Sequence, residues 1–371
     1  MKHVYFDSAA TTPIHPEVLD VLIEKSRTHW GNPSSIHILG QKARVEIEQA
    51  RTQIAHLLGA KSTEIFFTSG ATESINMLIN GALTNGEIDH VFVSPIEHHA
   101  VLHTLKHISD EIKIHTIPIT QNGEIKLGEL ESLLQKFPKA LVIAMGVNNE
   151  IGIINPITEI ALLCKRYNAK LFSDMVQMVG KTKISLENID FASFSAHKFG
   201  GPKGIGVAYI SSLNNLQPLL YGGGQEQNMR AGTENLPSIS AMNRAFQLAI
   251  NSMESNNTLI ENLHDYLINQ LKSIFPNILI HGINGNKVPH IVNFSIPHFN
   301  EMEMMHMILD INGICVSQGS ACSSGATQKS HVLEAIDSIN ELSIRISFSP
   351  NNQIDEIDYL IEIIKKIKKN Q

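Results

Sequence analysis

The chain has 371 residues, of which 43% are hydrophobic and 18% are charged, a composition that is ordinary for a globular protein. At roughly 150 residues per domain, this length predicts about two domains. The formal charge of −7, from 29 basic and 36 acidic residues, argues against a general nucleic-acid or membrane surface, although a local patch could still act alone.

Three cysteines, Cys164, Cys315 and Cys322, are too few for a disulfide framework and fit a reducing compartment. The N-terminus lacks the pattern of a signal peptide, and no uncharged stretch of about twenty apolar residues predicts a membrane span. We therefore expect a cytoplasmic protein with no membrane partner and no direct contact with nucleic acid.

Short apolar runs alternate with helical patterns through the first 210 residues. The runs predict strands at Ile65–Thr68, His90–Ser94, Lys113–Pro118, Leu141–Val147, Lys170–Ser173, Phe191–Ser195 and Gly206–Ile210. Helices are predicted between them at Ala71–Leu83, His98–Ser109, Lys126–Gln135 and Ile157–Tyr167. This alternation indicates an α/β fold with a largely parallel sheet that is covered by helices on both faces. Ligands of such sheets bind at the carboxyl ends of the strands.

The pattern changes after about residue 240. One long helical stretch is predicted over Pro237–Phe275. It is followed by strands at Ile278–His281 and His290–Ser295, a helix near Glu301–Leu309, a loop rich in Ser, Gly and Ala, a strand at Ser343–Ser347 and a last helix. These elements predict a second, smaller α+β domain.

The sequence Thr68–Glu73 places a glycine turn between a predicted strand and a predicted helix. The first turn of a helix has unpaired backbone N–H groups and the positive end of the dipole, so Ala71 and Thr72 would suit a phosphate. Taken alone, the motif fits a capped helix without a ligand better, since most helix starts bind nothing.

A second motif runs from the strand ending at Ser195 to Lys198. A lysine at the end of a buried strand can be desolvated, which favours a Schiff base, and Ser195 and His197 could donate to a phosphate. The alternative is a surface lysine in a glycine turn. Lys203 competes for the role, but it lies inside that turn, so Lys198 is preferred.

Asp174 follows another predicted strand, and Gln177 comes three residues later. An acid at this position could pair with a protonated pyridine nitrogen, and Gln177 could reach a ring hydroxyl. A helix N-cap is an equally good interpretation of Asp174 on its own.

His98 also follows a strand, where an imidazole could stack on a flat ring and move protons near neutral pH. His99, His103 and His107 recur at helical spacing, which could indicate a metal site. No acidic partner and no H-E-x-x-H pattern accompany them, so a solvated histidine face is the preferred interpretation, and no metal is predicted.

Cys322 lies among small residues in a loop that would expose its sulfur, as a nucleophilic thiol requires. An inert cysteine in a Gly/Ser turn explains the same pattern, whereas Cys164 and Cys315 have apolar neighbours and are predicted to be core residues. Arg345, in an alternating strand, could clamp a carboxylate with two hydrogen bonds or form a surface ion pair.

Taken in order, these motifs resemble those of the cysteine desulfurases of the class V aminotransferase group, the NifS and IscS type. The resemblance covers nearly the whole chain and includes Phe6–Pro13, Gly31–Ser35, Thr68–Glu73, Glu97–His98, Val147–Gly152, Ser195–Lys198, Gly222–Glu226, Met229–Thr233 and Gly319–Cys322. It implies a pyridoxal-phosphate-dependent enzyme of fold type I. The large cofactor domain would span residues 16–250, and residues 1–15 with 251–371 would form the small domain that carries the cysteine loop.

The resemblance also implies roles for individual residues. Lys198 would form the Schiff base with pyridoxal phosphate, while Asp174 meets the ring nitrogen, Gln177 the ring hydroxyl, and His98 the face of the ring. The other cofactor-binding positions would be Ala71, Thr72, Asn149, Ser195, His197 and Thr233. In the family, the threonine at the position of Thr233 comes from the neighbouring subunit, which implies a homodimer.

The same resemblance implies that Asn149 and Arg345 grip the substrate carboxylate, with Asn32 nearby, and that Cys322 accepts sulfur. The chain stops soon after its last helix, where longer relatives have a tail that docks an iron–sulfur scaffold. A sulfur-acceptor protein is still expected as a partner.

The predicted reaction is the conversion of L-cysteine to L-alanine with a persulfide on Cys322, for iron–sulfur cluster assembly or tRNA thiolation. Lys198, His98 and Cys322 would be the catalytic residues. One alternative is an aminotransferase or lyase on the same fold, in which Cys322 is incidental. Another is a non-catalytic sulfur-relay protein.

Overall fold

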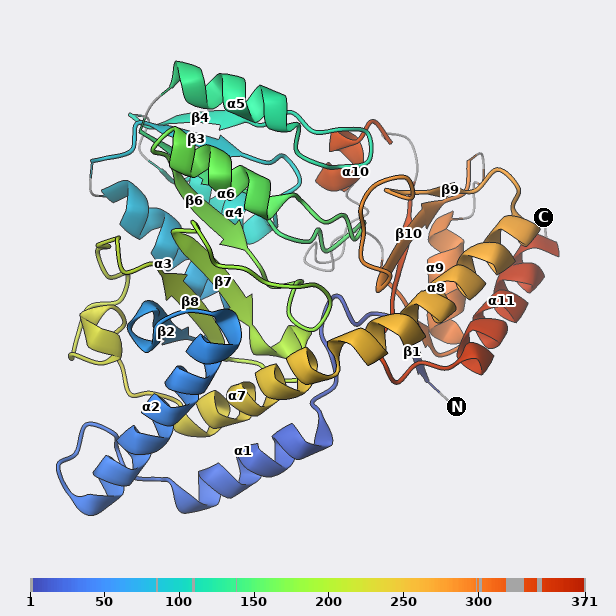
Figure 1. The fold of residues 1–371 in the computed structure, drawn as a ribbon. Coiled ribbons are helices and arrows are strands. Elements are labelled where there is room, and N and C mark those ends of the chain that lie inside the picture. The colour runs from blue at the N-terminus through green and yellow to red at the C-terminus, as the bar shows by residue number, and fades with distance from the viewer. Residues whose placement is uncertain are drawn as a thin grey trace.

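The computed structural model describes residues 3–84, 86–108, 111–137, 139–297, 299, 302–317, 330–338 and 342–369. In these ranges a large sheet with helices on both faces lies beside a smaller group of strands and helices, and both chain ends lie at the smaller group (Figure 1). None of the described helices combines the length and the apolar character needed to cross a bilayer.

The large sheet has seven strands among the described residues. Their spatial order is β2 (Ile65–Thr68), β8 (Gly206–Ile210), β7 (Phe191–Ser195), β6 (Lys170–Asp174), β5 (Ala140–Ile143), β3 (His90–Val93) and β4 (Lys113–Thr116). Strand β8 is antiparallel to both of its neighbours, and the other pairs are parallel. The predicted α/β fold with a largely parallel sheet is therefore confirmed.

Alternate residues of the strands pack on opposite faces of the sheet, because successive side chains of a strand point to opposite sides. Phe67, Phe92, Val142 and Leu171 pack on one face, under α2 (Ile38–Leu58), α5 (Leu127–Lys136), α6 (Ile157–Arg166) and α7 (Leu236–Asn251). Phe66, Val91, Leu141 and Phe172 pack on the other face, under α3 (Ala71–Thr84) and α4 (His99–Leu105). The helix α1 (Pro16–Thr28) lies on α7. Burial on both faces explains why these strands read as continuous apolar runs.

The smaller group has a core of its own. It contains an antiparallel sheet in the order β12 (Ile344–Ser347), β10 (Ile291–Ser295) and β9 (Leu279–Ile280), and the parallel pair β1 (Val4–Tyr5) and β11 (Ile314–Cys315). The helices α8 (Met253–Ile274), α9 (Met302–Ile311) and α11 (Ile354–Lys369) cover these strands. Val4 and Phe6 are buried in this core, so the first residues of the chain pack with its last 120 or so.

Three predicted elements were wrong in extent. The helix expected over His98–Ser109 is α4, which ends at Leu105. The helix expected over Pro237–Phe275 is two helices, α7 and α8, because Ser252 leaves the helical conformation at φ −97° and ψ 3° and its hydroxyl bonds the carbonyl of Leu248 (Figure 1). The strand expected over Leu141–Val147 ends at Ile143, and the residues beyond it turn toward the functional site.

The short helix α10 (His331–Ala335), which the sequence did not predict, packs beside the large sheet, against residues of the loops that follow β3 and β5. Val332 and Leu333 of α10 and Ile336 after it form a small apolar cluster with Ile96, Ile151 and Ile153. Ser330, at the N-cap, donates a hydrogen bond to the buried carboxylate of Glu150. The segment that follows the predicted cysteine loop is thus held beside the large sheet.

A buried ion pair fixes the loop between β8 and α7. Arg51 donates two hydrogen bonds of 2.8 Å to the carboxylate of Glu226. The same carboxylate accepts a hydrogen bond of 2.7 Å from the N–H of Phe67. Glu226 and the next two residues have φ values of +45°, +55° and +69°, a left-handed run that costs energy in residues other than glycine. The ion pair holds this run in place, and two residues beyond it Arg230 pairs with Glu73 at 2.8 Å.

Buried histidines in the smaller group make a prediction about acid stability. Burial, aided by the charge of Lys181, lowers the pKa of His290 to about 3, and burial with the charge of Lys287 lowers that of His281 to about 4. The unfolded chain takes up these protons below its pKa of about 6.5 but the folded chain does not, so stability is present above pH 6.5 and is lost as the pH falls. Each histidine should lower the free energy of unfolding by about 2 kcal/mol between pH 7 and pH 5.

The measurement is urea unfolding of wild type and His290→Gln at pH 7 and pH 5, followed by circular dichroism. The variant should lose less stability on acidification than wild type. Glu97, Glu150 and Asp174, whose pKa values burial raises, act in the opposite direction in both proteins, so only the difference between the two slopes is informative. The exposed His56→Gln is the control. Equal slopes for wild type and His290→Gln would contradict the prediction.

Candidate active site

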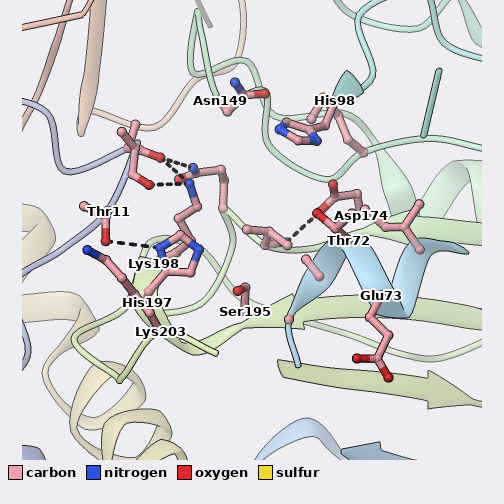
Figure 2. A pocket seen from close by; sticks show the side chains of 18 of the residues that line it. Thr11, Thr72, Glu73, His98, Asn149, Asp174, Ser195, His197, Lys198 and Lys203 are labelled. Carbon is pink, nitrogen blue, oxygen red and sulfur yellow. Dashed lines mark hydrogen bonds between the residues drawn. The ribbon is translucent and has the colours of Figure 1, made fainter. Parts of the chain in front are cut away.

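A cavity of about 490 Å³ lies at the carboxyl ends of β6 and β7 and is lined by side chains from both groups of elements (Figure 2). Ten of the predicted site residues meet there: Ala71, Thr72, His98, Asn149, Asp174, Gln177, Ser195, His197, Lys198 and Arg345. Open α/β sheets place their ligand sites at this edge.

One end of the cavity can hold an anion. Ala71 and Thr72 form the first turn of α3, whose leading N–H groups have no partner within the helix. Ser195 ends β7 nearby, and His197 follows in a single 3₁₀ turn, Ala196–Lys198. Burial, with the charges of Lys198 and Lys203, lowers the pKa of His197 to about 4, so its imidazole is neutral at pH 7. N–H groups, a hydroxyl and a helix N-terminus together suit a phosphate.

Gly206 lets the first turn of α3 approach β7 and β8 this closely. A Cβ at Gly206 would lie 2.6 Å from the carbonyl oxygen of Phe194 and 2.7 Å from Cα of Gly70. Any side chain would push α3 away from Ser195. The Arg230–Glu73 pair adds a second restraint, since Glu73 also accepts 2.9 Å from the N–H of Ser69.

Lys198 points into the cavity, and its Nζ donates to the backbone carbonyls of Ala9 at 2.8 Å and Ala10 at 2.7 Å (Figure 2). The competing Lys203 also lines the cavity but is exposed in the glycine turn. The N-terminal segment therefore fixes the amine of Lys198, and this arrangement favours Lys198 as the residue that would hold a cofactor.

Asp174 is buried at the end of β6 with an exposed fraction of 4%. One of its oxygens accepts a hydrogen bond of 3.0 Å from the N–H of Val176. Burial raises the pKa of Asp174 to about 6, against the opposing influence of that N–H group and the charge of Lys198. A buried carboxylate that lines a cavity is suited to a protonated ring nitrogen of a ligand.

His98 is the N-cap of α4, and its Nδ1 accepts a hydrogen bond of 3.0 Å from the N–H of Ala100. Burial, followed by the charge of Lys198 and neighbouring histidines, lowers the pKa of His98 to about 4. At pH 7 the ring is therefore neutral and carries its proton on Nε2, because Nδ1 is an acceptor.

The three histidines at helical spacing lie in different surroundings. His103 and His107 are exposed, as expected for a solvated face, but His99 packs against His331 with ring centroids 4.6 Å apart. Within the described ranges, no three His, Cys, Asp or Glu side chains are arranged to hold a metal ion.

Arg345 is almost completely buried, with an exposed fraction of 1%, so the surface ion pair considered from its sequence was wrong. It donates a hydrogen bond of 2.8 Å to the carboxylate of Asp7 and one of 2.9 Å to the backbone carbonyl of Asn149. A guanidinium has five N–H groups, so both terminal nitrogens keep a hydrogen for a ligand. Asn149 and Arg345 line the cavity side by side in this arrangement and could contact a carboxylate together.

Two predicted site residues that the structure describes do not line the cavity, and a third cannot be placed. Asn32 is exposed, and its side-chain oxygen accepts a hydrogen bond of 2.9 Å from the N–H of Ser34. Thr233 is exposed in the loop before α7. Cys322 lies outside the described residues.

The sequence interpretation missed the N-terminal contribution to the cavity. Ala9 and Ala10 supply the carbonyls for Lys198, and the hydroxyl of Thr11 lies 3.1 Å from Nδ1 of His197. Met145 and Lys203 line the cavity as well. The run Phe6–Pro13 was part of the family resemblance, so it carried a signal, but small apolar residues do not reveal a role that belongs to their backbone.

These side chains fit pyridoxal phosphate. The N-terminal turn of α3 with Ser195 and His197 suits its phosphate, Asp174 suits its ring nitrogen, and Lys198 between them suits its aldehyde. The imidazole of His98 lies on the same cavity, as expected for a ring that stacks on a planar ligand (Figure 2).

The sequence matches the aminotransferase class-V family over residues 4–360. The chain belongs to this family, whose enzymes depend on pyridoxal phosphate, and the predicted fold class, enzymatic character and cofactor are confirmed. Among curated relatives, the cysteine desulfurase IscS of Dictyoglomus turgidum is 39% identical over 378 residues, which cover 99% of this chain and 94% of that protein. The cysteine desulfurase IscS of Methanosarcina thermophila is 37% identical over 99% of this chain and 92% of its own length.

Solved structures of similar fold also include proteins of this kind. A NifS-like protein superposes with a TM-score of 0.92 at 35% identity and covers the whole of both chains. The structure described as SspA in complex with cysteine has a TM-score of 0.80 at 30% identity and covers 94% of this chain and 100% of that one. The predicted resemblance to the cysteine desulfurases is therefore confirmed.

Proposed function

We propose that this protein is a cysteine desulfurase that uses pyridoxal phosphate to convert L-cysteine to L-alanine. The observation that carries the proposal is the cavity in which Lys198, Asp174 and Arg345 meet. An amine, a buried acid and a guanidinium there suit a cofactor and an amino-acid carboxylate. The relatives named cysteine desulfurase, and the neighbour solved in complex with cysteine, support L-cysteine as the substrate.

The cofactor would be held at three points. Nζ of Lys198 would bond its aldehyde carbon, the carboxylate of Asp174 would face its ring nitrogen, and Gln177 its ring oxygen. Ala71, Thr72, Ser195 and His197 would bind the phosphate, and His98 would lie against the ring. When bound there, pyridoxal phosphate supplies an electron sink for the carbon that loses its proton.

Substrate orientation would depend on Asn149 and Arg345, with Asn32 nearby. Arg345 is held by Asp7 and by the carbonyl of Asn149, so its guanidinium is oriented before the substrate arrives. Lys198 would remove the proton from Cα of the substrate, since its Nζ lies in the same cavity. His98 would hold a proton on Nε2 beside the substrate thiol.

Sulfur would pass to Cys322. Its thiolate would attack the sulfur of the substrate, the bond between that sulfur and Cβ would break, and Cβ would keep the electron pair and take a proton. Lys198 would then return a proton to Cα, so that the products are alanine and a persulfide on Cys322. An acceptor protein would then take the sulfur, for iron–sulfur cluster assembly or tRNA thiolation, in the cytoplasm.

A homodimer is part of the proposal. Thr233 is exposed and absent from the lining of this chain's cavity, which suits a residue that completes the phosphate site of a second subunit. We also propose that residues 16–250 form the cofactor domain and that residues 1–15 with 251–371 form the small domain. The separate apolar cores of the two groups support this division.

The test is incubation of the protein, loaded with pyridoxal phosphate, with L-cysteine and a thiol reductant. Alanine and sulfide should appear in a one-to-one ratio, measured by amino-acid analysis and a sulfide assay. Pyruvate with ammonia would indicate a lyase, and a keto acid with transfer of the amino group would indicate an aminotransferase. A protein that neither binds the cofactor nor turns over L-cysteine would be a sulfur relay or scaffold, and each of these three outcomes would refute the proposal.

A further inference from the structure

The side-chain amide of Gln177 is held from both ends. Its Nε2 donates 2.8 Å to the carbonyl of Ala9, and its Oε1 accepts a hydrogen bond from Nζ of Lys181. The carbonyl of Ala9 can only accept, and Lys181 in its ammonium form can only donate, so together they leave the amide one orientation. Gln177 also lines the cavity, so the second hydrogen of Nε2 is left for a ligand.

Lys181 is held in place by contacts outside the cavity. It ends the turn that follows β6, and its N–H bonds the carbonyl of Met178 at 2.9 Å. Its own carbonyl accepts 3.0 Å from Nδ2 of Asn257, on α8. Gly180, at φ +71°, packs so closely on α7 that an added Cβ would lie 3.0 Å from Cβ of Ala249. The backbone at Lys181 is thus held against both α7 and α8.

We infer that Lys181 is a positioning residue, which fixes the amide of Gln177 so that an N–H group, and not a carbonyl oxygen, faces the ring oxygen of pyridoxal phosphate. The inference rests on the proposed cofactor site. If the amide were reversed, Oε1 would meet the lone pairs of the ring oxygen, and two acceptors would repel each other.

The cost of keeping a lysine here supports the inference. Burial, followed by the charges of Lys198 and Arg345, lowers the pKa of Lys181 to about 7. A charged amine is therefore unfavourable at this place, and a methionine of similar length would avoid that cost. Lys181 does not line the cavity, and its hydrogen bond to Gln177 is a direct contact with a side chain that does.

The test is a double-mutant cycle on cofactor binding. The dissociation constant of pyridoxal phosphate is measured by equilibrium dialysis with cofactor-free wild type, Lys181→Met, Gln177→Met and the double variant, and the visible absorbance maximum of each loaded protein is recorded. Lys181→Met should weaken binding about tenfold and shift the absorbance maximum, since one charge-assisted hydrogen bond orients the amide. In the Gln177→Met background the same change should add less than about twofold.

Two further variants separate a specific effect on Gln177 from a general effect of losing a lysine. Lys181→Arg, which can still only donate, should restore binding to within about threefold. Lys183→Met, an exposed neighbour in the sequence, should match wild type. If Lys181→Met does not fold, Lys181→Gln serves in its place, because it can accept as well as donate and no longer fixes the amide.

A loss that is equally large with and without Gln177 would assign Lys181 a structural role and overturn the inference. Unchanged binding and absorbance in Lys181→Met would overturn it as well. Both results leave the proposed function intact. Wild type that does not bind pyridoxal phosphate would instead refute the proposed function and the inference together.

Discussion

Lys198→Ala is expected to lose the covalent link to pyridoxal phosphate and to slow alanine formation by at least about a thousandfold, because the amine both holds the cofactor and moves the proton at Cα. Lys198 is the lysine that follows β7, and the carbonyls of Ala9 and Ala10 fix its Nζ. The link is measured by reduction with borohydride and mass spectrometry of the peptide that carries residues 191–204.

Lys203→Ala is the matched comparison, since Lys203 lines the same cavity but is exposed. The reduced adduct should remain on Lys198 in this variant. An adduct found on Lys203 of the wild-type protein, or retained in full by Lys198→Ala, would show that the wrong lysine has been assigned.

Cys322→Ser is expected to lower alanine formation by at least about a thousandfold while cofactor binding survives, because a serine hydroxyl does not attack sulfur as a thiolate does. The two described thiols are poor substitutes. Burial raises the pKa of Cys164 strongly, and burial with the charges of Asp310 and Asp7 raises that of Cys315. Neither of them lines the cavity.

Cys315→Ser is the control for Cys322→Ser, and it should keep cofactor binding and most of the activity. The measurements are alanine release from L-cysteine and the visible spectrum of the loaded protein. Full desulfuration by Cys322→Ser would exclude Cys322 as the sulfur acceptor. Loss of activity in Cys315→Ser with a normal spectrum and normal stability would point to that thiol instead.

Local patterns predicted the strand-end part of the site. Asp174, Ser195 and Lys198 follow buried apolar runs, and parallel strands bring their carboxyl ends to one edge, so the grouping of these residues could be inferred from the sequence. The first turn of α3 was predicted for the same reason.

Contacts between distant parts of the chain could not be predicted in this way. The pairing of Arg345 with Asp7, and the carbonyls that Ala9 and Ala10 offer to Lys198, depend on packing and not on a local pattern. The break at Ser252 was missed because α7 and α8 both have helical periodicity and only a single polar residue separates them. The orientation of Gln177 likewise depends on Lys181, four residues later but outside the cavity.

The joining of the two chain ends has a consequence for how the protein is made. Arg345 bonds a residue 338 positions earlier, and the side chain of Ser347 accepts from the N–H of Ala9 across the same separation. During synthesis, Lys198 leaves the ribosome long before β12 exists, so the bonds that Asp7 makes with Arg345 and Ala9 makes with Ser347 cannot yet hold the segment at residues 7–10. The nascent large sheet can form early, but Arg345 lines the cavity, so the cavity is complete only after β12 has emerged, and we expect substrate binding to be a late property of the folding chain.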